Sequence, residues 1–274
     1  MKLKKIIIFL GLIFWPLTLL LANTPLDLIR YLLPALILLF SFNLFQKGKN
    51  YFEYPLLFIS LIEPKLTLFP LIFALILYIT DKKHITLRRS SVVLLISIAL
   101  IVTNFFELSR QTIFVKDYEA QQKVLRNITL YPNVLTARIF QNKARIIINK
   151  FDDNFFTLTD PNNYFFSNHP REDILANQNL IKYPFLAIIP FFIGIYFISK
   201  NNDRKFIIIS AVAALLTLTL LTNFDRHDFV LWVPVSLIFT DGVKKMAKKK
   251  YFTVFASIFL IISFIELIRA YYLF

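Results

Sequence analysis

Four ionisable residues in a row, Asp225-Arg226-His227-Asp228, are the densest group in the chain that could take part in chemistry. They separate two apolar stretches, residues 206–222 and 229–240. Charges at a membrane boundary are costly to bury and are often functional. Arginine presents a planar fork that suits a phosphate, and histidine can share charge or transfer a proton. The pattern therefore predicts phosphate binding by Arg226 and His227, with a solvated, internally ion-paired turn as the alternative.

A second polar cluster, Ser167–Asp173, contains His169, Arg171 and Glu172. The topology predicted from the charge distribution places this cluster on the same side of the membrane as Arg226. We therefore expect His169 and Arg171 to help bind the phosphate in the head group of a membrane lipid. The alternative is a loop cluster that caps the helix that follows.

Glu63 and Lys65 flank Pro64 in the middle of the apolar segment Tyr51–Thr80. Proline removes a backbone donor and keeps the preceding residue out of the helical conformation, so we expect two short helices that meet here. A broken helix at membrane depth is tolerated only inside the protein or beside a wet cavity. Glu63 and Lys65 are therefore predicted to line a cavity. The alternatives are that the two charges pair with each other, or that the segment is one tilted span.

Asp152 and Asp153 are adjacent carboxylates without further spaced ligands, and the chain has no cysteine. A bound Ca²⁺ takes several oxygen ligands, so two adjacent carboxylates are a weak signal. No nucleotide-binding or metalloprotease motif is present either. We therefore predict no metal site and identify no cofactor.

The elements that must position these residues are strongly apolar. Of the 274 residues, 57% are hydrophobic and 18% are charged, against about 45–50% and about 25% in a typical soluble domain. The net charge is +14, but the basic residues lie at the ends of apolar segments, where the positive-inside rule puts them. The composition predicts an all-α polytopic transmembrane bundle and no nucleic-acid partner.

A helix needs about 20 apolar residues to cross the hydrocarbon core, or as few as about 17. About seven stretches are interpreted as full spans, and the broken short-helix pair in Tyr51–Thr80 returns the chain between two of them. The spans are predicted at residues 6–21, 28–45, 90–108, 184–199, 206–222, 229–240 and 251–268. This threading puts every short basic loop, and the N-terminus, in the cytoplasm. We predict a multi-pass protein of the cytoplasmic (inner) membrane; a cleaved signal peptide is the alternative for the first apolar run.

The spans divide the chain into three predicted domains. Transmembrane helices occupy residues 1–108 and 184–274, and one large extracytoplasmic loop occupies residues 109–183. Basic and acidic residues nearly balance in this loop, which suits a translocated segment. Within it, residues 134–151 interleave apolar and basic side chains in a pattern typical of an amphipathic helix lying in the membrane interface.

Four stretches resemble a known family in their order and spacing. They are Leu61–Thr67 with Pro70, Phe140–Lys143 followed by Tyr164–Phe166, Tyr183–Gly194, and Arg226–Gly242. Together they resemble the later part of GT-C-type membrane glycosyltransferases, specifically the protein-mannosyltransferase/aminoarabinose-transferase-like group. The resemblance implies transfer of a sugar from a polyprenyl-phosphate donor on the outer membrane face, with Arg226 and His227 at the positions that would hold the donor.

The resemblance does not supply a catalytic base. In that family an acidic residue in the first long outer loop has this role, whereas the first outer connection here, Ala22–Asp27, is far too short for such a loop. Asp225 or Glu172 is the predicted catalytic acid if this chain transfers sugar, and a separate chain is the predicted partner if the site is shared. The alternative functions are a non-enzymatic membrane subunit or scaffold in cell-envelope assembly and, third, a small transporter.

Overall fold

The computed structural model describes residues 2–22, 25–80, 84–115, 118–130, 133, 135, 142–166, 181–224 and 226–273. Within these ranges every regular element is helical, apart from an isolated antiparallel bridge between Thr112 and Leu221. The predicted all-α class is therefore confirmed for the part of the chain that the structure describes. Asp225, His169, Arg171 and Glu172 lie outside the described residues.

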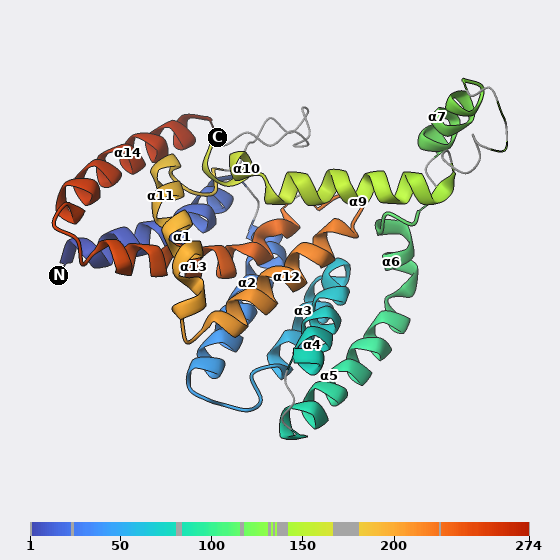
Figure 1. Ribbon diagram of the computed structural model, residues 1–274, viewed down its shortest axis with the longest axis horizontal. Coiled ribbons are helices and arrows are strands. Elements are labelled where there is room, and N and C mark those ends of the chain that lie inside the picture. The colour runs from blue at the N-terminus through green and yellow to red at the C-terminus, as the bar shows by residue number, and fades with distance from the viewer. Residues whose placement is uncertain are drawn as a thin grey trace.

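The first half of the chain alternates long helices with short, broken ones (Figure 1). Its elements are α1 (Lys2–Ala22), α2 (Pro25–Gln46), η1 (Tyr54–Leu56), α3 (Leu57–Ile62), η2 (Pro64–Thr67), α4 (Leu68–Thr80), α5 (His84–Thr103) and α6 (Phe105–Gln111). The second half follows with α7 (Tyr118–Ile128), α9 (Lys143–Thr159), α10 (Pro161–Phe165), η3 (Phe185–Ala187), α11 (Ile188–Phe197), η4 (Ile198–Lys200), α12 (Arg204–Thr219), η5 (His227–Leu231), α13 (Trp232–Met246) and α14 (Phe252–Leu273). Figure 1 shows α9 running across one side of the bundle, with α7 beyond its N-terminal end.

Two of the described helices are long and apolar enough to cross a membrane, at Leu28–Gln46 in α2 and Phe252–Tyr272 in α14. A third span is counted if the pair Arg89–Thr103 and Phe105–Gln111, which is bent by 77°, is taken as one. This count is well below the seven or so full spans that the hydropathy pattern predicts. The difference is one of length, because several of the predicted spans form helices shorter than the hydrocarbon core requires.

The shorter apolar helices account for most of the missing spans. The segments η2–α4 and η3–α11–η4 are apolar but run for only 10–17 residues. The helix α12 has 16 residues and α13 has 15. At about 1.5 Å per residue, 16 residues extend roughly 24 Å, which falls short of a core about 30 Å thick.

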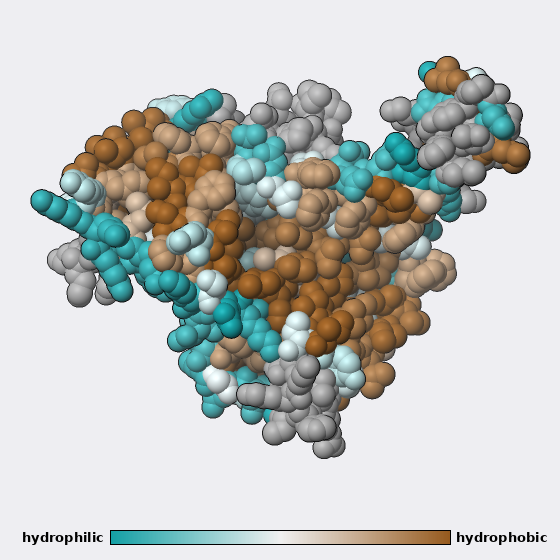
Figure 2. All heavy atoms as spheres, viewed as in Figure 1, coloured by the Kyte–Doolittle hydropathy of each residue, from teal (hydrophilic) through white to brown (hydrophobic). Residues whose placement is uncertain are grey.

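The outer surface of the bundle is apolar between two hydrophilic zones. In Figure 2 a broad brown surface separates a teal zone along α9 and α10 from a second one at the lower left. The exposed large apolar side chains include Leu95 and Val102 of α5 and Ile261 and Phe264 of α14. Apolar surface of this extent marks contact with a membrane or a partner rather than with water. Together with the candidate spans, it supports assignment of the chain to a membrane.

The basic clusters meet at one end of the bundle. The side-chain amide of Gln46 donates to Asp203 at 2.9 Å, which joins the end of α2 to the start of α12. The Arg89 guanidinium donates to a carbonyl in the loop after α2 at 2.9 Å, and Asn201 donates to Asp241 of α13. We call this end the lysine end; it carries Lys47, Lys49, Arg89, Lys200, Arg204, Lys244, Lys245, Lys248, Lys249 and Lys250.

The segment 51–80 leaves the lysine end and returns to it. The helix α3 ends at Ile62, Glu63 is extended (φ −130°, ψ 96°), and η2 begins at Pro64. The break therefore lies where the proline pattern predicts it, and its cause is local: the residue before a proline avoids the helical region. One carboxylate oxygen of Glu63 also accepts from the Lys65 backbone N–H at 3.4 Å and so caps the new helical turn.

The predicted amphipathic helix, residues 134–151, lies partly outside the described residues, and its described part from Lys143 onward belongs to α9. Residues 134 and 136–141 lie outside the described residues, and α9 starts at Lys143, where Asn142 accepts from the Arg145 backbone N–H at 3.0 Å. The helix continues eight residues past Phe151, to Thr159, and its last turns are anchored in the bundle. There Asn154 is buried and donates to the carbonyls of Thr219 and Leu221 at 3.0 and 2.7 Å. These two contacts satisfy carbonyls at the end of α12 that have no partner within the helix.

The helices α11 and α13 pack with their backbones in direct contact. A Cβ atom added to Gly194 would overlap the carbonyl of Ile238, and one added to Gly242 would overlap the carbonyl of Pro190. Small residues of this kind let neighbouring helices approach closely inside a membrane. No flexible side chain is available at either contact to move aside, because the nearest atoms belong to the backbone.

We predict that Gly242→Ala lowers the stability of the fold by about 1–3 kcal/mol, the usual cost of overpacking a tight core. The measurement is the thermal unfolding midpoint of the purified protein in detergent. Ile195→Ala is the control, because Ile195 lies on α11 but is exposed. Equal midpoints for Gly242→Ala and the wild type would contradict the close contact.

Candidate functional site

The turn between α12 and α13 carries Arg226 and His227. Arg226 has a φ of 59° and is the one non-glycine residue with positive φ in the described part of the chain. Such a backbone conformation costs free energy and is found mainly where surrounding structure enforces it, often at functional sites. The 3₁₀ turn η5 starts immediately after it, so the unusual backbone sets the direction in which the His227 side chain leaves the chain.

His227 is buried, with 5% of its surface exposed, and faces α2. Its ring lies 5.3 Å from the ring of Tyr31, centroid to centroid, at an angle of 58°. Its Nδ1 atom is buried and has no hydrogen-bond partner among the described residues. Most buried polar side-chain atoms in proteins are hydrogen-bonded, so an exception calls for an explanation such as an unseen ligand.

The surroundings of His227 disfavour its protonation. Burial lowers the pKa of His227 to about 3, and the positive charges of Lys65 and then Arg30 add to this effect. The imidazole is therefore neutral at physiological pH and offers one N–H donor and one acceptor nitrogen. The two cations that add to this shift come from η2 and α2.

Glu63 is buried at the helix break and pairs with Arg30. The Nε atom of Arg30 lies 2.5 Å from Oε2 of Glu63, in a close approach of opposite charges that lacks the alignment of a hydrogen bond. Glu63 is fully buried, whereas about half of the Arg30 side chain is exposed. The alternative that Glu63 pairs with the Lys65 ammonium is therefore wrong, since only the Lys65 backbone N–H reaches the carboxylate.

These contacts relate Glu63, Lys65 and His227 to one another through Arg30, and Arg226 directly precedes His227 in the chain. We call the group formed by Arg30, Glu63, Lys65, Arg226 and His227 the cationic site, because it holds three permanent positive charges and one carboxylate. Arg30 was not predicted from the sequence, although a lone charge in a stretch otherwise interpreted as a membrane span is a signal that could have identified it. The predicted residues Asp225, His169, Arg171 and Glu172 fall outside the described residues, so their distances to the site are not part of this geometry.

A buried ion pair lies directly behind the cationic site. The Lys182 ammonium nitrogen lies 2.5 Å from Oδ2 of Asp228 and 2.5 Å from Oδ1 of Asn163, and all three side chains are almost fully buried. The same nitrogen lies 4.9 Å from the ring centroid of Trp15 and 5.3 Å from that of Tyr164. Cation–π contacts of this kind strengthen when the cation is removed from water. In the sequence, Lys182 is one of many charged residues of the predicted outer loop.

This pair holds the η5 turn against two other parts of the chain. Trp15 of α1 contacts Tyr164, Tyr183 and Phe229 edge-on, with ring centroids 6.0, 6.0 and 5.3 Å apart. Burial raises the pKa of Tyr164 well above its usual range, and the negative charge of Asp228 raises it further. The Tyr164 hydroxyl therefore stays protonated and donates to the Leu158 carbonyl at 2.7 Å. Asp228, which follows His227 in the chain, is thereby fixed to α10 and α1.

No group of three or more His, Cys, Asp or Glu side chains that could hold a metal ion occurs in the described ranges. The chemistry that the site offers is recognition of an anion, because a neutral imidazole with an unpartnered nitrogen lies within the electrostatic influence of a half-exposed arginine and a lysine. Comparison with known proteins gives no match: no family model, no curated protein and no solved structure is significantly similar to the chain.

We expect Lys182 and Asp228 to contribute to the free energy of unfolding mainly through their contact with each other. Replacing Lys182 alone by Met leaves the Asp228 carboxylate buried without a counter-charge, which typically costs about 3–5 kcal/mol. The double variant Lys182→Met/Asp228→Leu removes both charges and should be closer in stability to the wild type. Unfolding free energies of the wild type, both single variants and the double variant form the test, with the exposed Lys143→Met as control. A double variant no more stable than the sum of the two single losses would contradict a direct coupling.

We also predict a pH dependence of stability that originates at His227. The unfolded chain takes up a proton near pH 6.5, whereas the folded chain resists protonation of His227 down to about pH 3. In that window the unfolded state binds the extra proton, so the free energy of unfolding decreases as the pH falls, by up to about 1.4 kcal/mol per pH unit. The variant His227→Phe, which keeps the ring against Tyr31, should lose less stability between pH 7 and pH 5. The same loss in both proteins would show that His227 is not the origin.

Proposed function

We propose that the protein binds the phosphate of a polyprenyl-phosphate, or of a polyprenyl-phosphate-linked sugar, at the cationic site. The observation that carries this proposal is the buried His227 Nδ1, which lacks a partner among the described residues and lies beside the charges of Arg30 and Lys65. A phosphate oxygen bound here would accept from the neutral imidazole, from the guanidinium and from the ammonium. Hydrogen bonds to a charged oxygen are stronger than those between neutral groups.

The position of Arg30 supports a lipid as the source of that phosphate. Arg30 lies within the first turn of the candidate span Leu28–Gln46, and its side chain is half exposed. Ile29, directly before it, and Leu36 and Phe40, further along α2, are exposed with the spacings of seven and four residues that place them on one helix face. An isoprenoid chain laid along this face would leave its phosphate at the level of Arg30.

The same proposal includes an orientation in the membrane. The lysine end lies in the cytoplasm by the positive-inside rule, which places the N-terminus there and the cationic site on the outer face of the cytoplasmic membrane. The shorter apolar helices then complete a multi-pass bundle by packing against the longer ones, where local thinning of the bilayer compensates for their short length.

The described carboxylates support binding rather than sugar transfer. Glu63 is paired with Arg30, and Asp228 is paired with Lys182. Both carboxylates are held by a cation of the same chain and are almost fully buried, so neither is placed to contact an acceptor hydroxyl. This observation favours a GT-C-like lipid-binding membrane subunit in envelope assembly. Sugar transfer would need Asp225, Glu172 or a carboxylate from a second chain.

We expect saturable binding of a polyprenyl phosphate to the purified protein in nanodiscs. Lys65→Ala, Arg226→Ala and His227→Phe should each weaken it about tenfold or more, because loss of one charge-assisted contact costs roughly 1.5–3 kcal/mol. Lys143→Ala is the matched control, since it removes one exposed lysine at the start of α9, outside the cationic site.

Two results would contradict the proposal. One is the absence of saturable binding by a wild-type protein that unfolds cooperatively. The other is equal affinity in the wild type, the three site variants and the control. Thermal unfolding midpoints recorded for each variant separate loss of the site from loss of the fold.

A further inference from the structure

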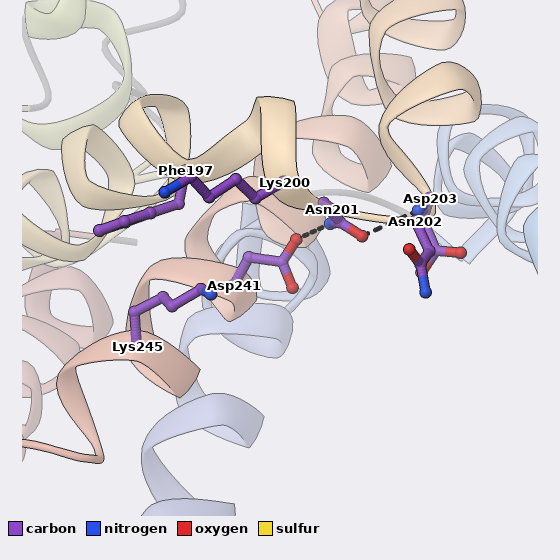
Figure 3. A pocket seen from close by; sticks show the side chains of 7 residues that line it. All are labelled: Phe197, Lys200, Asn201, Asn202, Asp203, Asp241 and Lys245. Carbon is purple, nitrogen blue, oxygen red and sulfur yellow. Dashed lines mark hydrogen bonds between the residues drawn. The ribbon is translucent and has the colours of Figure 1, made fainter.

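A pocket at the lysine end is formed by residues that the cationic site does not use. It has a volume of about 350 Å³ and lies between the turn after α11 and the last turns of α13. Its lining consists of Phe197, Lys200, Asn201, Asn202, Asp203, Asp241 and Lys245 (Figure 3). This volume is in the lower part of the range for small-molecule sites and accommodates a polar head group.

The two carboxylates of the pocket are occupied by other donors. Asp241 accepts from the Asn201 amide and pairs with Lys244 at 3.3 Å, and Asp203 accepts from Gln46 of α2 at 2.9 Å. Asn201 in turn accepts from the Asp203 backbone N–H at 2.8 Å, as the dashed lines in Figure 3 show. The acids therefore hold the turn in place: the charge of Asp241 is balanced by Lys244, and Asp203 is held by the neutral Gln46 amide.

The two lysines of the pocket converge on one aromatic ring. The Nζ atoms of Lys200 and Lys245 lie 5.8 and 5.1 Å from the ring centroid of Phe197. Both side chains are exposed, and neither ammonium makes an ion pair with a described carboxylate. Both ammonium groups attract an anion that enters the pocket.

The pocket opens at the border between the apolar surface and the lysine end. On α11, Phe192, Ile195 and Tyr196 are exposed just before Phe197 in the chain. A lipid whose tails cover these side chains would carry its phosphate to the level of the two lysines. Basic pockets beside membrane helices on the cytoplasmic side are suited to anionic head groups, because that leaflet is rich in them.

We propose that this pocket binds the phosphate of an anionic phospholipid through Lys200 and Lys245. The proposal is independent of the function assigned to the cationic site, since the two groups share no residue and lie at different ends of the bundle. It specifies the lipid by its chemistry: one phosphate with net negative charge, between two ammonium groups, with acyl chains against α11.

The experiment is a titration of the full chain in detergent with phosphatidylglycerol, with bound lipid counted by native mass spectrometry. Lys200→Ala/Lys245→Ala should lower the affinity on the order of tenfold or more. The control Lys248→Ala/Lys249→Ala removes the same charge from the same end, outside the pocket, and should bind as the wild type does. Lys200→Arg/Lys245→Arg keeps both charges and should retain most of the binding.

Further arms distinguish the source of the phosphate. Phosphatidylcholine, which has the same phosphate but no net charge, should bind at least about tenfold more weakly than phosphatidylglycerol. Inorganic phosphate at millimolar concentration should not displace the bound lipid. Equal losses in the pocket variant and the control, equal binding of both lipids, or displacement by inorganic phosphate would each overturn the proposal. Unchanged unfolding midpoints in the lysine variants show that folding is intact.

Discussion

The buried contact between Lys182 and Asp228 is the interaction on which the arrangement of this fold depends. A charge pair removed from water is stable only when its geometry is good and its remaining hydrogen-bonding groups are satisfied. Here Asn163 accepts a second hydrogen bond from Lys182, and the rings of Trp15 and Tyr164 supply polarisable surface around the same ammonium. The contact therefore connects α1, α10, the segment before η3 and the η5 turn at a single point.

This contact explains how the neighbouring residues His227 and Asp228 have different roles, one in the candidate site and one in the fold. Asp228 points into the fold and is held by Lys182, whereas His227 points toward α2 and toward the cations Arg30 and Lys65. Successive side chains of a 3₁₀ turn point in widely different directions. Lys182, the partner of Asp228, therefore does not change the surroundings of His227. The imidazole is left neutral in a positive environment, as suits a donor to a bound anion.

Local stereochemistry could be predicted from the sequence, and long-range pairing could not. The break at Pro64 follows from the proline itself, whatever surrounds it. The number of long spans does not follow from hydropathy, because α12 ends at Thr219, where the chain turns to bond with Thr112 and Gln111. Lys182 looks like any other lysine of a polar loop, since its partner Asp228 lies 46 residues further along the chain. Arg30 could be predicted only in part: its position in an apolar stretch marks it as a candidate functional residue, but its pairing with Glu63 could not be predicted.

The bonds from Asn154 to the end of α12 have a consequence for how this chain can change. The α9 helix extends away from the bundle at its N-terminal end. Near its C-terminal end it donates hydrogen bonds to backbone carbonyls at the end of α12. The segment that follows it supplies Asn163 and Tyr164 to the buried lysine. The part of the loop from α9 onward therefore cannot be replaced on its own. A replacement would remove both the hydrogen bonds that cap α12 and the side chains that surround the Lys182 ammonium. Neither contact involves α7, so a change in the length of α7 would leave both in place.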